Sequence, residues 1–516
     1  MANPFRPLLQ RAVNYAWERG WIAGANRGDA LQRRHYMRSF KGAEMTRLTA
    51  SQDRVPTTAD SELMRDLRTL RARSRELGRN SGYMRRFLRL LQSNVVGPNG
   101  ISLQSAVLTG RGKPREGINN AIERAWLKWG RDCGNCEDLT WRDVENLALA
   151  SAAEDGEFFV ELVFDSSPYG LTLRVHDAEL IDTEHCNESL ADGGYIRMGI
   201  EYDEADRVRG YWLRRMSQDG RHYEGDTFAS TRRPTSRFVP AASMVHGFKR
   251  DRVGQTRGTP WASAIMWRHH MQEGYEDAAV TAARVGAAKM GFFTAGSEGY
   301  RGTEEDSDGN PLIDGFTPGG IEVLPEGVDF QSFNPDYPHA QFGDFSKHML
   351  QSISAGLNVS YPSLSNDLEG VNFSSIRAGV LEDREVFKEL QTWLIDRLHE
   401  RVFKAWLEAA LRNGMVSTPN VVLASRDIET LCQPRWTGRR WAWVDPLKDV
   451  QAQKTSYDMG ATSLSAIIRE TGRDPEDVWR ERKREGELLA KFGVETAPAA
   501  PNTPTPTEDN ANDGNA

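Results

Sequence analysis

The sequence predicts a mixed α/β protein of the α+β kind, with helices and an antiparallel sheet in different parts of the chain. In several long stretches, apolar residues recur at three- and four-residue steps, as in amphipathic helices. From about Trp141 to Phe248, short apolar or alternating runs are instead separated by Gly and Asp turns, which is typical of antiparallel strands. A chain of 516 residues is too long for one ordinary core, so we expect several subdomains.

The first helical stretch, residues 62–96, is rich in arginine. Breaks at Gly78 and at residues 80–82 predict two helices. Its arginines are Arg65, Arg68, Arg71, Arg73, Arg75, Arg79, Arg85, Arg86 and Arg89. Arginine suits bidentate phosphate contacts, which allows a nucleic-acid face. Acidic residues are interleaved with it, however, and this pattern favours a solvated or inter-subunit face.

A turn at Gly97–Gly100 precedes a short amphipathic helix over residues 117–130 that carries Trp126 and Trp129. The strands of the antiparallel sheet are then expected at Phe158–Phe164, Leu171–Val175, Tyr195–Tyr202 and Gly210–Leu213.

The second half of the chain is mainly helical by pattern. Helices are predicted from Trp261 to about Lys289, from Phe342 to Leu357 and from Ser374 to about Asn413. Between the first two, strand-like pieces at Gly291–Thr294 and Ile321–Leu324 flank an acidic loop with Glu304, Glu305, Asp306 and Asp308. Residues 358–374 form a polar loop whose length suggests a function. Residues 495–516 have almost no apolar content and are predicted to be a disordered tail.

Charge and hydropathy exclude some classes of protein. With 65 basic and 73 acidic side chains the net charge is −8, whereas a DNA-coating protein should be basic. This balance favours a channel that DNA passes through over a clamp that holds it. Residues 1–20 contain no apolar run long enough for a signal peptide, and no later stretch approaches the roughly 20 apolar residues of a membrane span. We expect a protein made in the cytoplasm with no membrane partner.

No sequence motif indicates an enzyme, a cofactor or a defined metal site. Residues 110–113 lack the Ser or Thr of a phosphate-binding loop, and neither H-E-x-x-H nor G-x-S-x-G occurs. Cys133 and Cys136 could form a zinc site with His185 and Cys186, but a single C-x-x-C is unspecific, and free thiols in a reducing cytosol are the preferred interpretation. We therefore expect no catalytic residue.

Several stretches resemble the lambda family of phage portal proteins. They are RNSGYMRRFLRLLQSNVVGPNG (79–100), EDGEFFVE (154–161), HDAELIDT (176–183), IEYD (200–203), FVPAASMVHGF (238–248), RVGQTRGTP (252–260), SAGLNVSYPSLSNDLEGVNFSS (354–375) and WVDPLKD (443–449). The resemblance covers most of residues 60–485, and its ordered combination is specific.

The resemblance implies a ring, typically of twelve subunits, at one capsid vertex. The implied divisions are a basic amino-terminal segment (1–60), a wing (61–258), a first stem helix (259–290), a clip (291–337), a second stem helix (338–357), a tunnel loop (358–374), a long helix through the wing to the crown (375–413), a returning wing segment (414–450), crown helices (451–494) and the tail (495–516). It also implies a mechanical role in the virion, in which the subunit provides the channel for double-stranded DNA during packaging and ejection.

The expected partners are the terminase large subunit, the major capsid and scaffold proteins, and the head-completion or tail connector proteins. The residues expected to face DNA are Lys347, Asn358, Ser365, Asn366 and Asn372, and the acidic residues Glu304, Glu305, Asp306 and Asp308 are expected to dock terminase or connector. Two alternatives remain open. One is another head–tail adaptor ring, which would lack a stem-length helix pair around a clip, and the other is a nucleic-acid-processing enzyme, which would need a metal site or nucleotide pocket.

Overall fold

The computed structural model describes residues 57–135, 138–216, 236–287, 291–295, 328–332, 342–369, 373–418, 423–441 and 446–493. By its internal contacts the chain separates into two units, Met1–Thr58 and Ala59–Ala516. The second unit carries every helix and strand described below, and it is mixed α/β as predicted. Nearly all of the expected amino-terminal segment, and the whole of the tail over residues 495–516, lie outside the described residues.

The arginine-rich stretch forms two α-helices, α3 (Ala59–Asn80) and α4 (Gly82–Leu91), followed by a π turn, η3 (Gln92–Val96). Ser81 separates them in an extended conformation, and its hydroxyl accepts a hydrogen bond from the Met84 amide at 3.3 Å. This N-cap confirms the break predicted at residues 80–82, because a serine side chain can satisfy an amide that the helix leaves unpaired. The break expected at Gly78 does not occur, because α3 continues through it.

A tryptophan-rich core joins α5 (Glu116–Trp129), α6 (Trp141–Asp155) and α11 (Glu400–Arg412). Trp126 is 3% exposed, and its ring lies 5.0 Å from that of Trp406 and 4.8 Å from that of Trp129. The sequence analysis missed α6, because it began the sheet region at Trp141. Thr140 and Asp143 form a capping box at the start of this helix, and their spacing in the sequence could have indicated it.

The antiparallel strands form two sheets rather than the one sheet that was expected. A three-stranded sheet has the order β3-β2-β8, and a four-stranded sheet has the order β4-β5-β6-β7. The strands are β2 (Glu157–Val163), β3 (Thr172–His176), β4 (Tyr195–Arg197), β5 (Ile200–Tyr202), β6 (Val208–Leu213), β7 (Arg237–Pro240) and β8 (Met244–Phe248).

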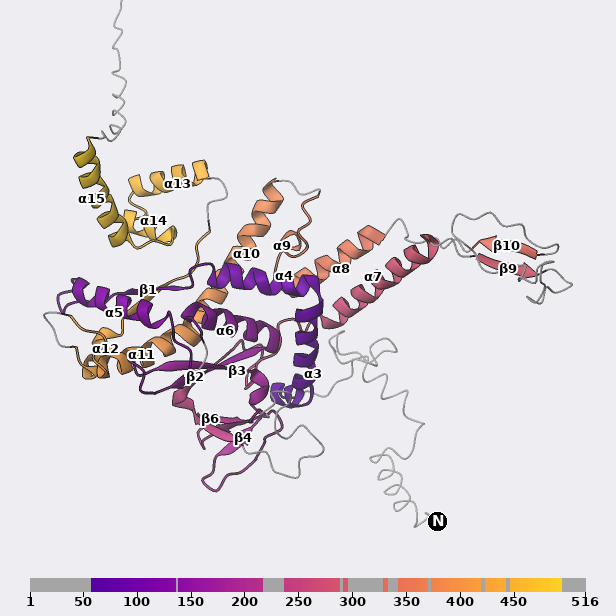
Figure 1. Cartoon of the computed structure of the whole chain (residues 1–516), viewed down its shortest axis with the longest axis horizontal. Coiled ribbons are helices and arrows are strands. Elements are labelled where there is room, and N and C mark those ends of the chain that lie inside the picture. The colour runs from indigo at the N-terminus through magenta and orange to yellow at the C-terminus, as the bar shows by residue number, and fades with distance from the viewer. Residues whose placement is uncertain are drawn as a thin grey trace, which may run out of the picture. The chain divides into compact units, whose positions relative to one another are not determined.

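Strand β2 explains the second sheet, because both of its faces are buried. Phe158 faces the main core, with its ring 5.8 Å from Trp393, whereas Phe159 belongs to a smaller core with Tyr211 of β6. Helix α6 contacts β2 and β3 (Figure 1). A strand that is buried on both faces needs a cover on each side, and here the four-stranded sheet provides the second cover.

Two helices, with a strand pair between them in the sequence, form an extension that leads away from the sheets (Figure 1). Helix α7 (Met266–Ala287) begins five residues later than predicted, because residues 261–265 form turns. Strands β9 (Gly291–Ala295) and β10 (Val328–Ser332) pair antiparallel, and α8 (Phe342–Gly356) returns along α7. The helices meet at Tyr275, whose ring lies 5.4 Å from Phe342 and 4.8 Å from Phe345. The strand predicted at residues 321–324 lies outside the described residues.

The predicted helix over residues 374–413 is confirmed as α10 (Phe373–Leu394), a π turn η6 (Ile395–His399) and α11 (Glu400–Arg412). His399, in the π turn, is fully buried, and its Nε2 lies 2.7 Å from Oε1 of Glu145 on α6. This buried polar contact ties the long helix to α6.

The remaining elements are β1 (Ser102–Ser105), which pairs antiparallel with β11 (Pro434–Thr437), three 3₁₀ turns (Ala178–Leu180, Ala241–Ser243, Ser425–Asp427), and the helices α9 (Tyr361–Ser365), α12 (Ile428–Leu431), α13 (Pro446–Asp458), α14 (Leu464–Glu470) and α15 (Pro475–Phe492). In the part of the chain that the structure describes, no helix combines the length and apolarity needed to cross a membrane.

Candidate channel segment and buried charge cluster

The polar segment after α8 is ordered by backbone caps and internal hydrogen bonds. Asn358 and Asn366 both adopt left-handed backbone conformations, with φ of 54° and 59°. Asparagine tolerates this region better than most residues, and here it follows a helix end on each side of α9. Residues 358–374 were expected to be a loop throughout, but residues 361–365 form the helix α9.

Asp383 of α10 holds the start of α9. Its carboxylate accepts hydrogen bonds from the Ser360 amide and hydroxyl, both at 2.7 Å, and from the Ser363 hydroxyl at 2.6 Å. Asp383 is only 6% exposed. A buried carboxylate is tolerated when several donors satisfy it, so the serines of this segment have a structural use that the sequence did not reveal.

Lys347 of α8 is paired within the same segment. Its Nζ lies 3.8 Å from Oδ2 of Asp367 and 5.7 Å from the centre of the Tyr361 ring, and the Tyr361 hydroxyl donates to Asp367 at 2.8 Å. Hydrogen bonds from the Glu369 amide and from Tyr361, followed by the charge of Lys347, lower the pKa of Asp367 below its ordinary value. The ammonium charge is therefore largely matched by a carboxylate at neutral pH.

Four of the five residues expected to face DNA lie in this segment or beside it. Ser365 donates its hydroxyl to the Tyr361 carbonyl at 2.8 Å and accepts from the Asp367 amide at 3.1 Å. Asn358, Asn366 and Lys347 have the backbone and pairing roles given above. The fifth residue, Asn372, and the acidic residues Glu304, Glu305, Asp306 and Asp308 lie outside the described residues. That these residues contact DNA or docking proteins stays a prediction.

A buried charge cluster joins stretches that are far apart in the sequence. Glu157 of β2 is fully buried, and its Oε1 contacts the guanidinium groups of Arg71 and Arg257, which are 1% and 0% exposed. Arg71 also reaches the Glu179 carboxylate at 3.1 Å, and Arg257 donates to the Met198 carbonyl at 2.6 Å. The cluster therefore fastens α3, β2 and the loop before α7 to one another.

The other oxygen of Glu157 is also satisfied. It accepts the Gly258 amide at 3.1 Å and lies 2.8 Å from Nε2 of His246 on β8. Burial alone would raise the pKa of Glu157, but the charges of Arg257 and Arg71 hold it well below its usual range. Burial lowers the pKa of His246, against the effect of Glu157. A carboxylate held ionised by two arginines is a poor general base, so the cluster serves structure rather than proton transfer.

Close backbone packing accompanies the cluster. Gly156, which precedes β2, has φ of +91°, and a Cβ added there would lie 2.5 Å from the Thr259 carbonyl carbon and 2.6 Å from that of Gly258. Only glycine fits such a contact at this backbone angle. The loop before α7 therefore rests directly on the start of β2.

Two arginines of α3, Arg71 and Arg75, point inward, whereas Arg65 is exposed and pairs with its neighbour Asp66. Arg75 pairs with Asp155 at 2.6 Å and with Asp177 at 2.5 Å, in addition to the burial of Arg71. Arg86 of α4 donates to the Ser363 carbonyl at 3.2 Å. These contacts give the stretch a structural use, but inside the subunit, whereas a solvated or inter-subunit face was expected. Sequence reasoning missed the cluster itself, although Glu157, Glu179, His246 and Arg257 all lie within the stretches that carried the family resemblance.

The suggested zinc site finds no support in the described residues. Cys133 is buried, and burial raises the pKa of its thiol to about 12. Cys186 is exposed, and Cys136 lies outside the described residues. Among the residues that the structure describes, no group of three or more His, Cys, Asp or Glu side chains is arranged to hold a metal ion.

Comparison with known proteins identifies the family. Residues 45–391 match the family described as "Phage portal protein, lambda family". The chain is 33% identical over 499 residues to the "Probable portal protein" of Halomonas phage phiHAP-1, covering 94% of this chain and 93% of that protein. It is 23% identical over 472 residues to "Portal protein B" of Escherichia phage lambda, covering 83% and 85%.

A more distant likeness is to a chain from the neck of an empty GTA particle, with 13% identity, a TM-score of 0.42 and coverage of 83% of this chain and 98% of that one. The match to the family over residues 45–391 and the near full-length similarity to the Halomonas phage protein are decisive: this chain belongs to the lambda family of phage portal proteins.

Proposed function

We propose that the chain is the ring-forming portal subunit at one vertex of a phage capsid, through which double-stranded DNA enters and leaves. Membership of the family over most of the chain carries this proposal. The extension formed by α7, β9, β10 and α8 supports it, because a stem and its clip require a helix pair with a strand pair between the two helices. The alternative, another head–tail adaptor ring, was expected to lack such a stem-length helix pair.

The proposed divisions follow the elements. Residues 61–258 with the returning segment 414–450 form the wing, α7 and α8 the stem helices, residues 291–337 the clip, and α13 to α15 the crown. The segment 358–374, including α9, is the tunnel loop, and α10 to α11 is the long helix that leads from it. We expect a ring of about twelve subunits, as is typical of the family.

The charge of the tunnel loop suits DNA passage. Residues 358–374 contain no Lys or Arg, and Lys347 of the adjacent stem helix α8 pairs with Asp367 of the loop. Each unpaired cation on a duplex-facing surface adds salt-dependent affinity for phosphate. A loop with no cation of its own, beside a lysine that is already paired, would touch DNA without holding it, which favours movement over binding.

The partners and location follow from the same role. The acidic loop with Glu304, Glu305, Asp306 and Asp308 would dock the terminase large subunit during packaging and the head-completion or tail connector proteins afterwards. The wing would contact the major capsid and scaffold proteins. The ring would assemble in the host cytoplasm and remain in the virion. The subunit would act mechanically, and the energy of packaging would come from the ATPase of the terminase.

Native mass spectrometry of the purified full-length chain tests this role. A closed ring of about twelve 58.0 kDa subunits, near 700 kDa, is expected, and negative-stain images should show a central hole. A chain that stays monomeric or dimeric with its scaffold protein present would contradict the proposal. So would hydrolysis of ATP, or DNA cleavage with added magnesium, by the purified subunit, because either would indicate an enzyme.

A further inference from the structure

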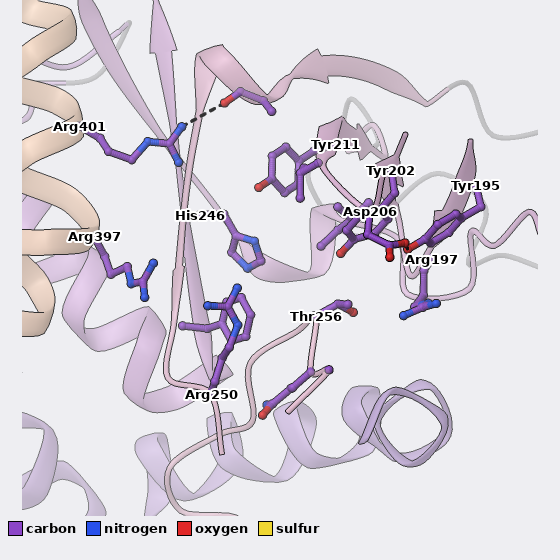
Figure 2. A pocket seen from close by; sticks show the side chains of 16 residues that line it. Tyr195, Arg197, Tyr202, Asp206, Tyr211, His246, Arg250, Thr256, Arg397 and Arg401 are labelled. Atoms are coloured by element: carbon purple, nitrogen blue, oxygen red, sulfur yellow. Dashed lines mark hydrogen bonds between the residues drawn. The ribbon is translucent and has the colours of Figure 1, made fainter. Parts of the chain in front are cut away.

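An open pocket of about 680 Å³ lies between the four-stranded sheet, β8 and the long helix. Figure 2 shows its two sides. Arg250, Arg397 and Arg401 approach His246 from one side, and tyrosines, including Tyr202 and Tyr211, form the other. The tyrosine wall also carries Asp206, which accepts the Tyr195 hydroxyl at 2.7 Å, and Arg197, which pairs with Asp60. The pocket is thus basic on one wall and mainly aromatic on the other, a combination that suits planar anionic groups.

The three arginines have no acidic partner in the described part of the chain. Arg401 donates to the Ala241 carbonyl at 3.2 Å, and the guanidinium of Arg250 lies 5.0 Å from the centre of the Phe248 ring. Neither these two arginines nor Arg397 lies within ion-pair distance of a carboxylate of the described residues. Other arginines near the sheets are paired, as Arg197 is with Asp60 at 3.0 Å. Three exposed, unpaired guanidinium groups around one cavity form a site for carboxylates.

An acidic region lies on the opposite side of α11 from the pocket. At about 100° per residue, Phe403 and Trp406 are turned about 200° and 140° around the helix from Arg401. Both of these rings pack against Trp126 of α5, at 5.6 Å and 5.0 Å. Helix α5 therefore lies on the side of α11 away from Arg401, so the two regions belong to different faces of the subunit.

Helix α5 carries an acidic side chain in an unfavourable setting. Glu123 is half-buried and accepts a hydrogen bond from the Ser105 amide at 2.7 Å. Burial raises the pKa of Glu123 to about 7, the Ser105 amide opposes the shift, and the nearby carboxylates Asp474, Asp477 and Glu476 add to it. Arg480 already pairs with Asp477 at 2.8 Å and with Glu476 at 3.4 Å, whereas Glu123 and Asp474 have no cation within ion-pair distance among the described residues. This acidic face, defined by Glu123, Asp474, Glu476 and Asp477, therefore keeps two carboxylates that cations of another chain would match.

We propose that the pocket formed by Arg250, Arg397 and Arg401 in one subunit receives the acidic face around Glu123 of the next copy in the ring. A ring closes through heterologous contacts, in which two different faces of the same chain meet head to tail. A basic pocket and an acidic face on opposite sides of α11 match that requirement. The cavity has room for a few side chains but not for a duplex. This inference rests on the ring proposed above.

Charge reversal and repair test the contact in the full-length chain. The double variant Arg397→Glu/Arg401→Glu should lower the fraction of subunits in rings by about tenfold or more at equal concentration, because desolvated charge pairs are lost and like charges meet. The matched control Arg482→Glu/Arg484→Glu changes two exposed arginines of α15 by the same total charge and should assemble normally. Adding Glu123→Arg to the first variant should restore part of the ring fraction.

A disulfide test reports the contact even if rings do not close. With Glu123→Cys and Arg401→Cys in one chain, mild oxidation should give a ladder of covalent oligomers on a non-reducing gel. Each single-cysteine variant should give no ladder, which controls for the native cysteines. The inference is overturned if Arg397→Glu/Arg401→Glu assembles like the unmodified chain or no ladder forms. If the unmodified chain forms rings with a central hole in that case, the portal role stands and only this contact is wrong.

Discussion

Replacing Glu157 by Gln should destabilise the fold more than most single substitutions, because this carboxylate serves two buried arginines. Arg71 and Arg257 are 1% and 0% exposed, and both contact Oε1 of Glu157. Glutamine preserves the shape of the side chain but removes the charge, so both guanidinium groups stay buried without it. Removing one partner of a buried ion pair costs about 3–5 kcal/mol. We expect a loss of free energy of unfolding in the upper part of that range.

Urea unfolding followed by tryptophan fluorescence measures this loss. The matched control is Glu389→Gln, because Glu389 is exposed and makes an ion pair with the partly exposed Lys249 at 3.1 Å. Solvent screening limits such a pair to about 1 kcal/mol. Both variants must be compared at one subunit concentration, since association adds to apparent stability. A loss of less than about 1 kcal/mol for Glu157→Gln, or one no larger than for Glu389→Gln, would refute the role given to the cluster.

Three further outcomes are expected. Gly156→Ala should lower the free energy of unfolding by about 2 kcal/mol or more, measured in the same urea assay, because a Cβ would meet the backbone at 2.5 Å at φ of +91°. Asp383→Asn should speed hydrogen exchange in α9 while the exposed neighbouring change Glu382→Gln does not, since Asp383 accepts three hydrogen bonds there. The stability gap between the unmodified chain and Glu157→Gln should shrink as pH falls below about 4.5. A carboxylate with a lowered folded-state pKa stabilises fully only above its unfolded value, and equal gaps at pH 7 and pH 3 would contradict this.

Local pattern was a good guide to the helices and a poorer guide to the sheets. The three-residue periodicity and the break near Ser81 predicted α3 and α4, and the apolar stripe predicted α10 and α11. Helix α6 was missed although its capping box was readable, because it runs into β2 with only Gly156 between them. The second sheet follows from burial on both faces of β2, which no single strand pattern reveals.

The candidate sites depend on contacts that sequence spacing does not encode. Glu157 lies 86 residues from Arg71 and 100 residues from Arg257, so no motif joins them. The family resemblance marked the stretches that contain Glu157 and Arg257, but not their association. For residues 358–374, the sequence correctly indicated polar character. It could not indicate that Asp383 and Asp367 already engage Ser360 and Lys347. Residues that were expected to face DNA because they are polar therefore have structural partners within the subunit.

A cryo-EM reconstruction of the purified full-length chain would test the proposed channel most directly. We predict a closed ring in which α9 and residues 358–369 line the narrowest part of a central hole, with α7 and α8 running beside those of neighbouring subunits. A ring with α9 on its outer surface, or an assembly without a continuous hole wide enough for duplex DNA, would contradict the channel role.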